Sequence, residues 1–257
     1  MKSAAIEIIK EKESSIDLIA TLAHELKTPV TSIKEAISLL SDLNNDILNI
    51  KNRRIIAIAQ EEIDRLVRMI DNFLKVASIE SGKTRLEKTE VKIEDIINSV
   101  LDTYSLKIRN KKMHIIKLFS KTPSLVLIDR DRMFEAIANI LDNAIKFTPT
   151  GGTITVKTKV TSKYADGLSN HHSTNKNNGL LVTISDTGPG ISKNNLERIF
   201  KKFERVKSTK HIRGIGLGLT ITRNIVELHD GKIWASNVKN RGAEFNILLP
   251  LAKNINR

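Results

Sequence analysis

The chain has 257 residues, which is more than one domain usually holds and favours two domains. It has no cysteine, so disulfides and thiolate metal sites are excluded, and its net charge of +13 favours an acidic partner. Only 4% of the residues are aromatic, which leaves few platforms for stacked bases and argues against nucleic acid. No apolar run approaches the roughly 20 residues of a membrane span. We therefore expect a soluble, cytoplasmic protein that reaches a membrane only if the native chain extends N-terminally.

Apolar residues at alternating spacings of three and four predict an amphipathic helix over 16–40. His24 lies one residue past a position of this apolar seam, on the shoulder of the helix. Pro29 has no N–H and its ring crowds the carbonyl of Glu25, so the helix should bend beside His24. A neutral imidazole is a nucleophile that Glu25 could assist as a general base. A surface His–Glu pair also explains the dipeptide, whereas a zinc-protease motif needs a second histidine where Thr28 stands.

A second helical pattern follows the polar turn 42–46 and continues over 56–77. Its apolar face is broader than a two-stranded seam, so two helices alone cannot bury it. A second copy of the chain would complete a four-helix bundle, which predicts a homodimer through residues of about 12 to 80. A helical hairpin that packs against its own second domain is the alternative.

The heptad pattern stops at a glycine in the segment 78–83, which predicts domains over 1–81 and 82–257. Gly82, Lys83 and Thr84 are similar to the end of a phosphate-binding P-loop. Such a loop must follow a strand and open a helix. Here a long helix precedes the glycine and an alternating segment follows it, which disfavours the P-loop.

Helical and extended patterns alternate in the second domain. Strands are predicted over 85–92, 113–119, 125–128, 153–160, 180–185, 232–236 and 243–249. Helices are predicted over 93–109, 130–147, 194–200 and 217–229. The fold class is therefore α+β, with a helical hairpin followed by one sheet that carries a helical layer on one face. The polar stretch 164–178 is expected to be a mobile hairpin loop.

Three groups of residues in this domain suit a nucleotide. Asn139, Asn143 and Lys146 share one helix face at i, i+4 and i+7, where they could hold a hydrated magnesium ion and a polyphosphate. Asp186 ends an apolar strand at a glycine-rich turn, and its carboxylate could accept the exocyclic amine of adenine. The glycine-rich segment 214–219 leads into a helix and offers backbone N–H groups to phosphate. A solvated helix face and ordinary turns also explain each group taken alone.

Five motifs, taken together and in order, resemble those of the sensor histidine kinases of two-component systems. The similar segments are 24–29 (H box), 139–147 (N box), 186–190 (first glycine box), 200–203 (F box) and 214–219 (second glycine box). The resemblance covers about residues 14 to 250. It implies a helical dimerisation and histidine-phosphotransfer domain, which forms a dimeric four-helix bundle. An α/β sandwich of the Bergerat (GHKL) type, with a mixed sheet, would follow and bind ATP and Mg²⁺.

The resemblance implies roles for the H box. His24 matches the phosphoacceptor, Glu25 its general base, and Thr28 the position that helps to hydrolyse the phosphorylated partner. The implied activity is ATP-dependent autophosphorylation of His24, followed by transfer of the phosphoryl group to an aspartate in the receiver domain of a response regulator. A pure ATPase, similar to the chaperone and gyrase ATPases, is one alternative. A scaffold or phosphatase-only protein and a direct nucleic-acid binder are the others.

The resemblance also assigns the nucleotide site. Asn143 matches the principal magnesium ligand and Asn139 its helper. Lys146 would contact phosphate, Phe147 would line the adenine pocket, and Asp186 would recognise adenine. The segment 187–213 would form the ATP lid. The other nucleotide-binding positions are Arg205, near the terminal phosphate, and Gly188, Gly190, Gly214, Gly216, Gly218 and Leu219.

Overall fold

The computed structural model divides the chain into two compact units, Met1–Thr84 and Arg85–Arg257. The residues it describes are 27, 30, 31, 33–35, 37, 38, 50–81, 84–121, 124–161, 178–202, 204, 216–238 and 242–252. A helical unit thus precedes a unit of helices and strands, which confirms the predicted α+β class. Of the helices within these ranges, none has the length and apolarity that crossing a bilayer requires.

The helical unit contains α2 (Ile50–Glu80) and, before it, a helical segment of which several residues between 27 and 38 are described. Two ion pairs join the segments, Lys27–Asp71 at 2.6 Å and Lys34–Asp64. The later lysine of the first segment pairs with the earlier aspartate of α2, so the two segments run antiparallel. Val30 and Ile70 are both buried. This arrangement confirms the predicted helical hairpin.

The second unit is built on a five-stranded mixed sheet with the order β2-β4-β5-β7-β6. The strands are β2 (His114–Leu118), β4 (Thr153–Thr161), β5 (Gly179–Asp186), β6 (Lys232–Asn237) and β7 (Ala243–Pro250). Only β2 and β4 pair in parallel; the other neighbours in this sheet are antiparallel. A separate antiparallel pair is formed by β1 (Lys88–Lys92) and β3 (Leu125–Asp129). The prediction of one sheet was therefore wrong, because these two strands pair with each other.

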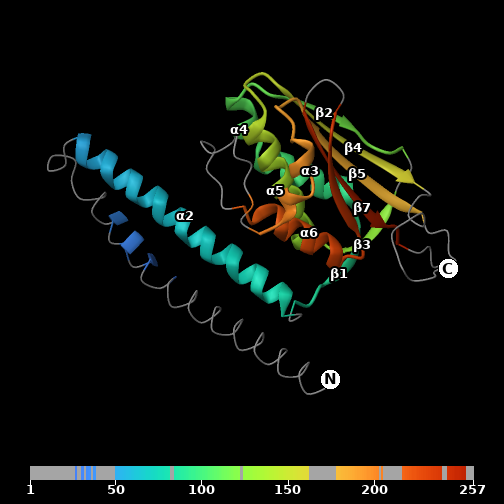
Figure 1. Cartoon of the computed structure of the whole chain (residues 1–257), viewed down its shortest axis with the longest axis horizontal. Helices are drawn as coiled ribbons and strands as arrows, with labels where there is room; N and C mark the ends of the chain where they lie inside the picture. Colours follow the sequence, from blue (N-terminus) through green and yellow to red (C-terminus); the bar gives the residue numbers. More distant parts are fainter. Residues whose placement is uncertain are drawn as a thin grey trace, which may run out of the picture. The chain divides into compact units, whose positions relative to one another are not determined.

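Three helices cover one face of the five-stranded sheet, as Figure 1 shows: α3 (Ile93–Thr103), α5 (Arg130–Phe147) and α6 (Gly218–Leu228). Alternate residues of the central strands face these helices. Val182 and Ile184 of β5 are buried, as are Ile137 and Ile140 on the apolar side of α5. Packing of this apolar side against the sheet leaves the opposite side of α5 for polar residues.

Side chains at the first turn of α5 explain why this helix begins at Arg130. Asp129 caps the helix, since its Oδ1 accepts a hydrogen bond from the backbone N–H of Arg132 at 3.1 Å. The backbone N–H of Asp129 donates to Nε2 of the buried His229 at 2.9 Å. Nδ1 of His229 lies 2.7 Å from the carbonyl oxygen of Ile225, to which it must donate. Burial lowers the pKa of His229, so a neutral imidazole ties the end of α6 to the start of α5.

Two predicted helices differ in the structure. The segment 93–109 is split at Tyr104 into α3 and the short α4 (Ser105–Asn110). In the last turns of α3, the hydroxyls of Ser99 and Thr103 each donate to the carbonyl four residues earlier, a pattern that bends helices. The segment 194–200 contains two 3₁₀ turns, η1 (Lys193–Asn195) and η2 (Arg198–Phe200), and neither has a side-chain cap.

Candidate nucleotide-binding site

Helix α5 presents the predicted magnesium and phosphate residues on its polar side. Asn139 and Asn143 are half-buried and Lys146 is exposed, whereas Leu141 and Ala144 between them are buried. The apolar side of the helix packs in the core, so the polar side cannot rotate away from its position. The structure therefore confirms that these three residues share one face.

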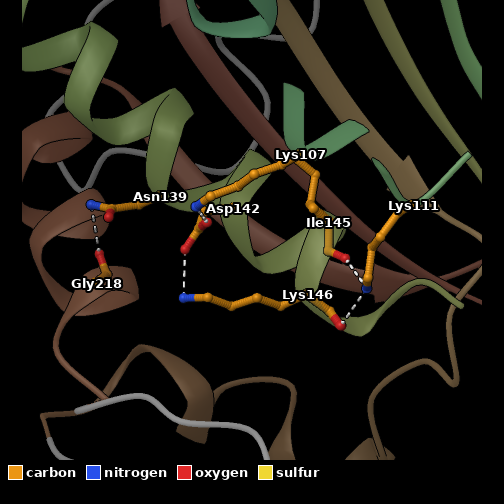
Figure 2. Close-up of polar contacts among 7 residues, drawn as sticks. All are labelled: Lys107, Lys111, Asn139, Asp142, Ile145, Lys146 and Gly218. Atoms are coloured by element: carbon orange, nitrogen blue, oxygen red, sulfur yellow. Dashed lines mark hydrogen bonds and ion pairs between the residues drawn. The ribbon is translucent and has the colours of Figure 1, made fainter. Parts of the chain in front are cut away.

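The start of α6 lies against this face. Nδ2 of Asn139 donates to the carbonyl oxygen of Gly218, the first residue of α6, at 3.4 Å (Figure 2). A Cβ at Gly218 would lie 3.4 Å from Oδ1 of Asn139, which is ordinary van der Waals contact. Gly216, just before the helix, has a φ of +78°, which favours glycine. The end of the second glycine motif thus lies beside the asparagine that the sequence assigns to magnesium.

Asp186, at the end of β5, is the buried acid of the site. The residue is only 6% exposed, and burial raises the pKa of its carboxyl above 3.8 although backbone N–H groups oppose the shift. Oδ1 accepts from the N–H of Gly188 at 2.7 Å and from that of Ala243 at 3.3 Å. Both of these hydrogen bonds from described residues end on Oδ1, which leaves Oδ2 for a ligand.

The turn after Asp186 approaches the end of α5 closely. A Cβ at Gly188 would lie 2.8 Å from Oδ1 of Asp186 and 3.0 Å from the carbonyl oxygen of Phe147. Only glycine allows this approach. The structure therefore brings together three residues that the sequence places at the adenine end of the site, Phe147, Asp186 and Gly188.

Gly242 makes the other close approach to Asp186, and it supplies a testable prediction. It has a φ of +112°, and a Cβ there would overlap the carbonyl oxygen of Asp186. Gly151 also has a positive φ, +77°, but a Cβ there meets nothing within 4 Å. We expect Gly242→Ala to lower the free energy of unfolding by more than about 3 kcal/mol, and the control Gly151→Ala by only about 1 kcal/mol. Urea unfolding measures both; equal losses would contradict the close approach.

Lys146 is engaged by a neighbouring acid. Its Nζ lies 2.5 Å from Oδ2 of Asp142, one turn earlier on α5. Oδ1 of Asp142 accepts from Nζ of Lys107 on α4 at 3.2 Å (Figure 2). Burial favours the neutral form of Asp142, but the two ammonium groups outweigh it and lower the pKa of the carboxyl. Asp142 is therefore ionised at neutral pH.

The donor groups present fit both ATP and Mg²⁺. Oγ1 of Thr148 is fully buried and has no hydrogen-bond partner among the described residues, and its methyl group and Oγ1 of Thr187 both lie against Gly152. The orphaned hydroxyl is thus an unsatisfied polar group close to the glycine-rich turn, and Oδ2 of Asp186 offers an acceptor to a base. Described residues contain no cluster of three or more acids or histidines that could hold a metal. Two amide oxygens, with water and phosphates, are a sufficient set for Mg²⁺.

Several predicted site residues lie outside the described part of the chain. They are His24, Glu25 and Thr28 of the H box, together with Arg205 and Gly214. The insertion 164–178 also lies outside the described part, except for Asn178. Gly190 and Leu219 are described and half-buried, and Gly190 has a φ of +76°. The roles of all these residues remain predictions.

Sequence reasoning gave no role to Asp142, Lys107, Gly242 or Thr148. A pattern was available for Asp142 alone, since an acid four residues before a lysine on a helix predicts an ion pair. The other three act through contacts between segments far apart in the chain.

A separate hollow of about 350 Å³ lies between α3, α4 and β2. It is lined by Leu101, Ser105, Ile108, Arg109, Met113, Ile115 and Lys117. None of the predicted nucleotide residues is among them, and the lining offers no carboxylate to an adenine amine. It is therefore distinct from the site around Asp186.

Comparison with known proteins relates the two parts of the chain to two domain families. Residues 14–82 match the His Kinase A (phospho-acceptor) domain, HisKA. Residues 128–253 match the histidine kinase-, DNA gyrase B- and HSP90-like ATPases, HATPase_c. The chain belongs to the histidine kinase family.

Individual relatives agree with this family assignment. Over 97% of its length the chain is 33% identical to hybrid signal transduction histidine kinase D of Dictyostelium discoideum, of which it spans 16%. Over 91% of its length it is 27% identical to sensor histidine kinase WalK of Bacillus subtilis, of which it spans 36%. The full-length ShkA crystal structure in complex with AMPPNP has the same fold, with a TM-score of 0.74 and 24% identity over 92% of this chain and 46% of that one. The chain thus spans only a minor part of these curated relatives.

Proposed function

We propose that this chain is an ATP-dependent protein-histidine autokinase that passes its phosphoryl group to a response regulator. The observation that carries the proposal is that a HisKA match containing His24 and a HATPase_c match containing Asp186 occur in one chain. The gyrase B-like and HSP90-like ATPases share the second family, but a nucleotide-binding unit alone would give a pure ATPase. The phosphoacceptor family in the same chain favours the kinase.

The proposed nucleotide orientation follows from the two ends of the site. Oδ2 of Asp186 accepts a hydrogen bond from the exocyclic amine of adenine, and Phe147 lines the pocket for the base. The polyphosphate extends toward Asn139, Asn143 and the start of α6, where backbone N–H groups and Lys146 supply positive charge. Bound Mg²⁺, held by the oxygens of Asn143 and Asn139, would neutralise phosphate charge.

In the proposed reaction, a ring nitrogen of His24 attacks the γ-phosphorus in line with the leaving group. The nitrogen–phosphorus bond forms as the bond to the β,γ-bridging oxygen breaks; ADP leaves, and Glu25 takes the ring proton. A carboxylate oxygen of the regulator aspartate then attacks the same phosphorus and displaces the imidazole. Thr28 would support hydrolysis of the resulting acyl phosphate, as the phosphatase step of the same protein.

The helical unit also supports the proposed homodimer. Ile33, Ile58 and Leu66 are 52%, 52% and 41% exposed, although all three lie on amphipathic helices. Apolar side chains left open by one hairpin can be buried by the hairpin of a second copy, which would complete a four-helix bundle.

Labelling with ATP tests the proposed function. Incubation of the wild-type chain with Mg²⁺ and γ-³²P-labelled ATP should give a labelled protein, whereas α-³²P-labelled ATP should not. The label should be lost in acid and retained in alkali, as expected of phosphorus bonded to an imidazole nitrogen. Release of free phosphate without labelled protein would contradict the kinase and indicate a pure ATPase.

A further inference from the structure

We propose that Asp142 is a positioning residue that holds the Lys146 ammonium ready for a phosphate, with Lys107 restoring the positive charge that this contact neutralises. The proposal rests on the proposed function, in which Lys146 contacts the nucleotide phosphates. It concerns the three side chains that meet in Figure 2.

The geometry makes Asp142 the centre of the cluster. Its side chain is 20% exposed, against 40% for Lys146 and 61% for Lys107, so the acid is the most buried of the three. Each carboxylate oxygen contacts a different ammonium group. Oδ2 lies beside Nζ of Lys146, and Oδ1 lies beside Nζ of Lys107. An ammonium has three hydrogens, so one contact to Asp142 leaves Lys146 two donors for a ligand.

Lys146 is held at both ends. Beneath it, Nζ of Lys111 contacts the carbonyl oxygens of Ile145 at 2.6 Å, Lys146 at 3.2 Å and Thr148 at 3.0 Å. This lysine caps the end of α5 and fixes the backbone of Lys146. Asp142 fixes the other end, the ammonium. A flexible lysine that is ordered in advance loses less conformational entropy when a phosphate binds.

The charge of the cluster explains the need for Lys107. A pair formed by Asp142 and Lys146 alone has no net charge and would attract a polyphosphate weakly. With Lys107 the cluster carries one net positive charge. Lys107 is itself oriented, since its Nζ lies 4.9 Å from the centre of the Tyr104 ring. Tyr104 and Lys107 thus link the α3–α4 junction to the phosphate end of the site.

A purely structural role is the competing explanation, because i,i+4 ion pairs also stabilise helices. The two explanations differ in the ligand that they affect. Positioning of Lys146 affects nucleotides with phosphates only, whereas a distorted α5 would weaken every ligand that contacts the site. Adenosine has the same base as ATP and no phosphate, so it separates them.

The test compares Mg-ATP and adenosine as competitors of a fluorescent nucleotide, with the whole chain. We expect Asp142→Asn to raise the Kd of Mg-ATP about five-fold and that of adenosine less than two-fold. Lys107→Gln should raise the Kd of Mg-ATP by a smaller factor, and this effect should shrink at high salt. In the Lys146→Met background, Asp142→Asn should add nothing further. Glu135→Gln, which alters the Arg132–Glu135 pair at 3.7 Å on the same helix, is the matched control and should leave both Kd values unchanged.

Each contrary result has a distinct meaning. A parallel loss of ATP and adenosine binding in Asp142→Asn overturns the proposal in favour of a structural role. Tighter ATP binding overturns it as well, because Asp142 would then be withholding Lys146 from the phosphate. Wild-type affinity in Lys146→Met overturns both the proposal and the assigned role of Lys146. A wild-type chain that does not bind ATP contradicts the proposed function itself.

Discussion

Replacement of His24 by glutamine is expected to abolish labelling of the protein by γ-³²P-labelled ATP, with a loss of at least about 1000-fold. Glutamine is similar in size and polarity, but its amide has no nucleophilic lone pair comparable to that of a neutral imidazole. No nitrogen–phosphorus bond can then form, and the remaining motifs cannot replace the acceptor. The measurement is the rate of label incorporation under alkaline denaturing conditions, which preserve a phosphorylated imidazole.

Binding of Mg-ATP should be unchanged in the same variant. The residues assigned to the nucleotide lie in the second compact unit, residues 85–257, which has its own core. His114→Gln is the matched control, because His114 is an exposed histidine on β2 that belongs to none of the five motifs, and its removal should leave labelling intact. Labelling that persists in His24→Gln, or that disappears in His114→Gln, would contradict the assignment of the phosphoacceptor.

Elements with strong local patterns were predictable from the sequence. The predicted helix 130–147 agrees with α5 at both ends, because Asp129 is a capping residue and the apolar stripe has a clear helical period. The strands agree within about three residues, since alternation of apolar side chains identifies a half-buried strand. The break at Tyr104 and the pairing of β1 with β3 were missed. Both depend on hydrogen bonds and strand partners that local periodicity does not encode.

The site was predictable to the extent that it lies within single elements. Helical spacing was enough to place Asn139, Asn143 and Lys146 on one face. The approach of Asn139 to Gly218 joins residues 79 positions apart, and the contact of Asp142 with Lys107 joins residues 35 apart. Such contacts follow from the packing of α4, α5 and α6, which no local pattern contains.

Replacement of Asp186 by asparagine is expected to separate nucleotide recognition from stability. The amide oxygen can still accept the N–H groups of Gly188 and Ala243 that now bond Oδ1. Its NH₂ group would then replace Oδ2 and would face the adenine amine, donor against donor. A lost acceptor together with a buried unpaired donor should raise the Kd of ATP by about 30- to 100-fold. Displacement of a fluorescent nucleotide by ATP measures this loss.

The fold itself should not be weakened by Asp186→Asn, and pH provides the check. Burial raises the pKa of Asp186 in the folded state above its ordinary value of 3.8, so the folded state binds the proton more tightly than the unfolded state. The buried carboxylate therefore costs stability above this raised pKa, and the cost disappears as the pH falls through it to below 3.8. In urea unfolding, Asp186→Asn should be at least as stable as the wild type at pH 7, and this advantage should vanish near pH 3.5. Unchanged ATP affinity in Asp186→Asn would contradict the role of Asp186 in adenine recognition. A large loss of stability of this variant at pH 7 would show that the carboxylate charge supports the turn.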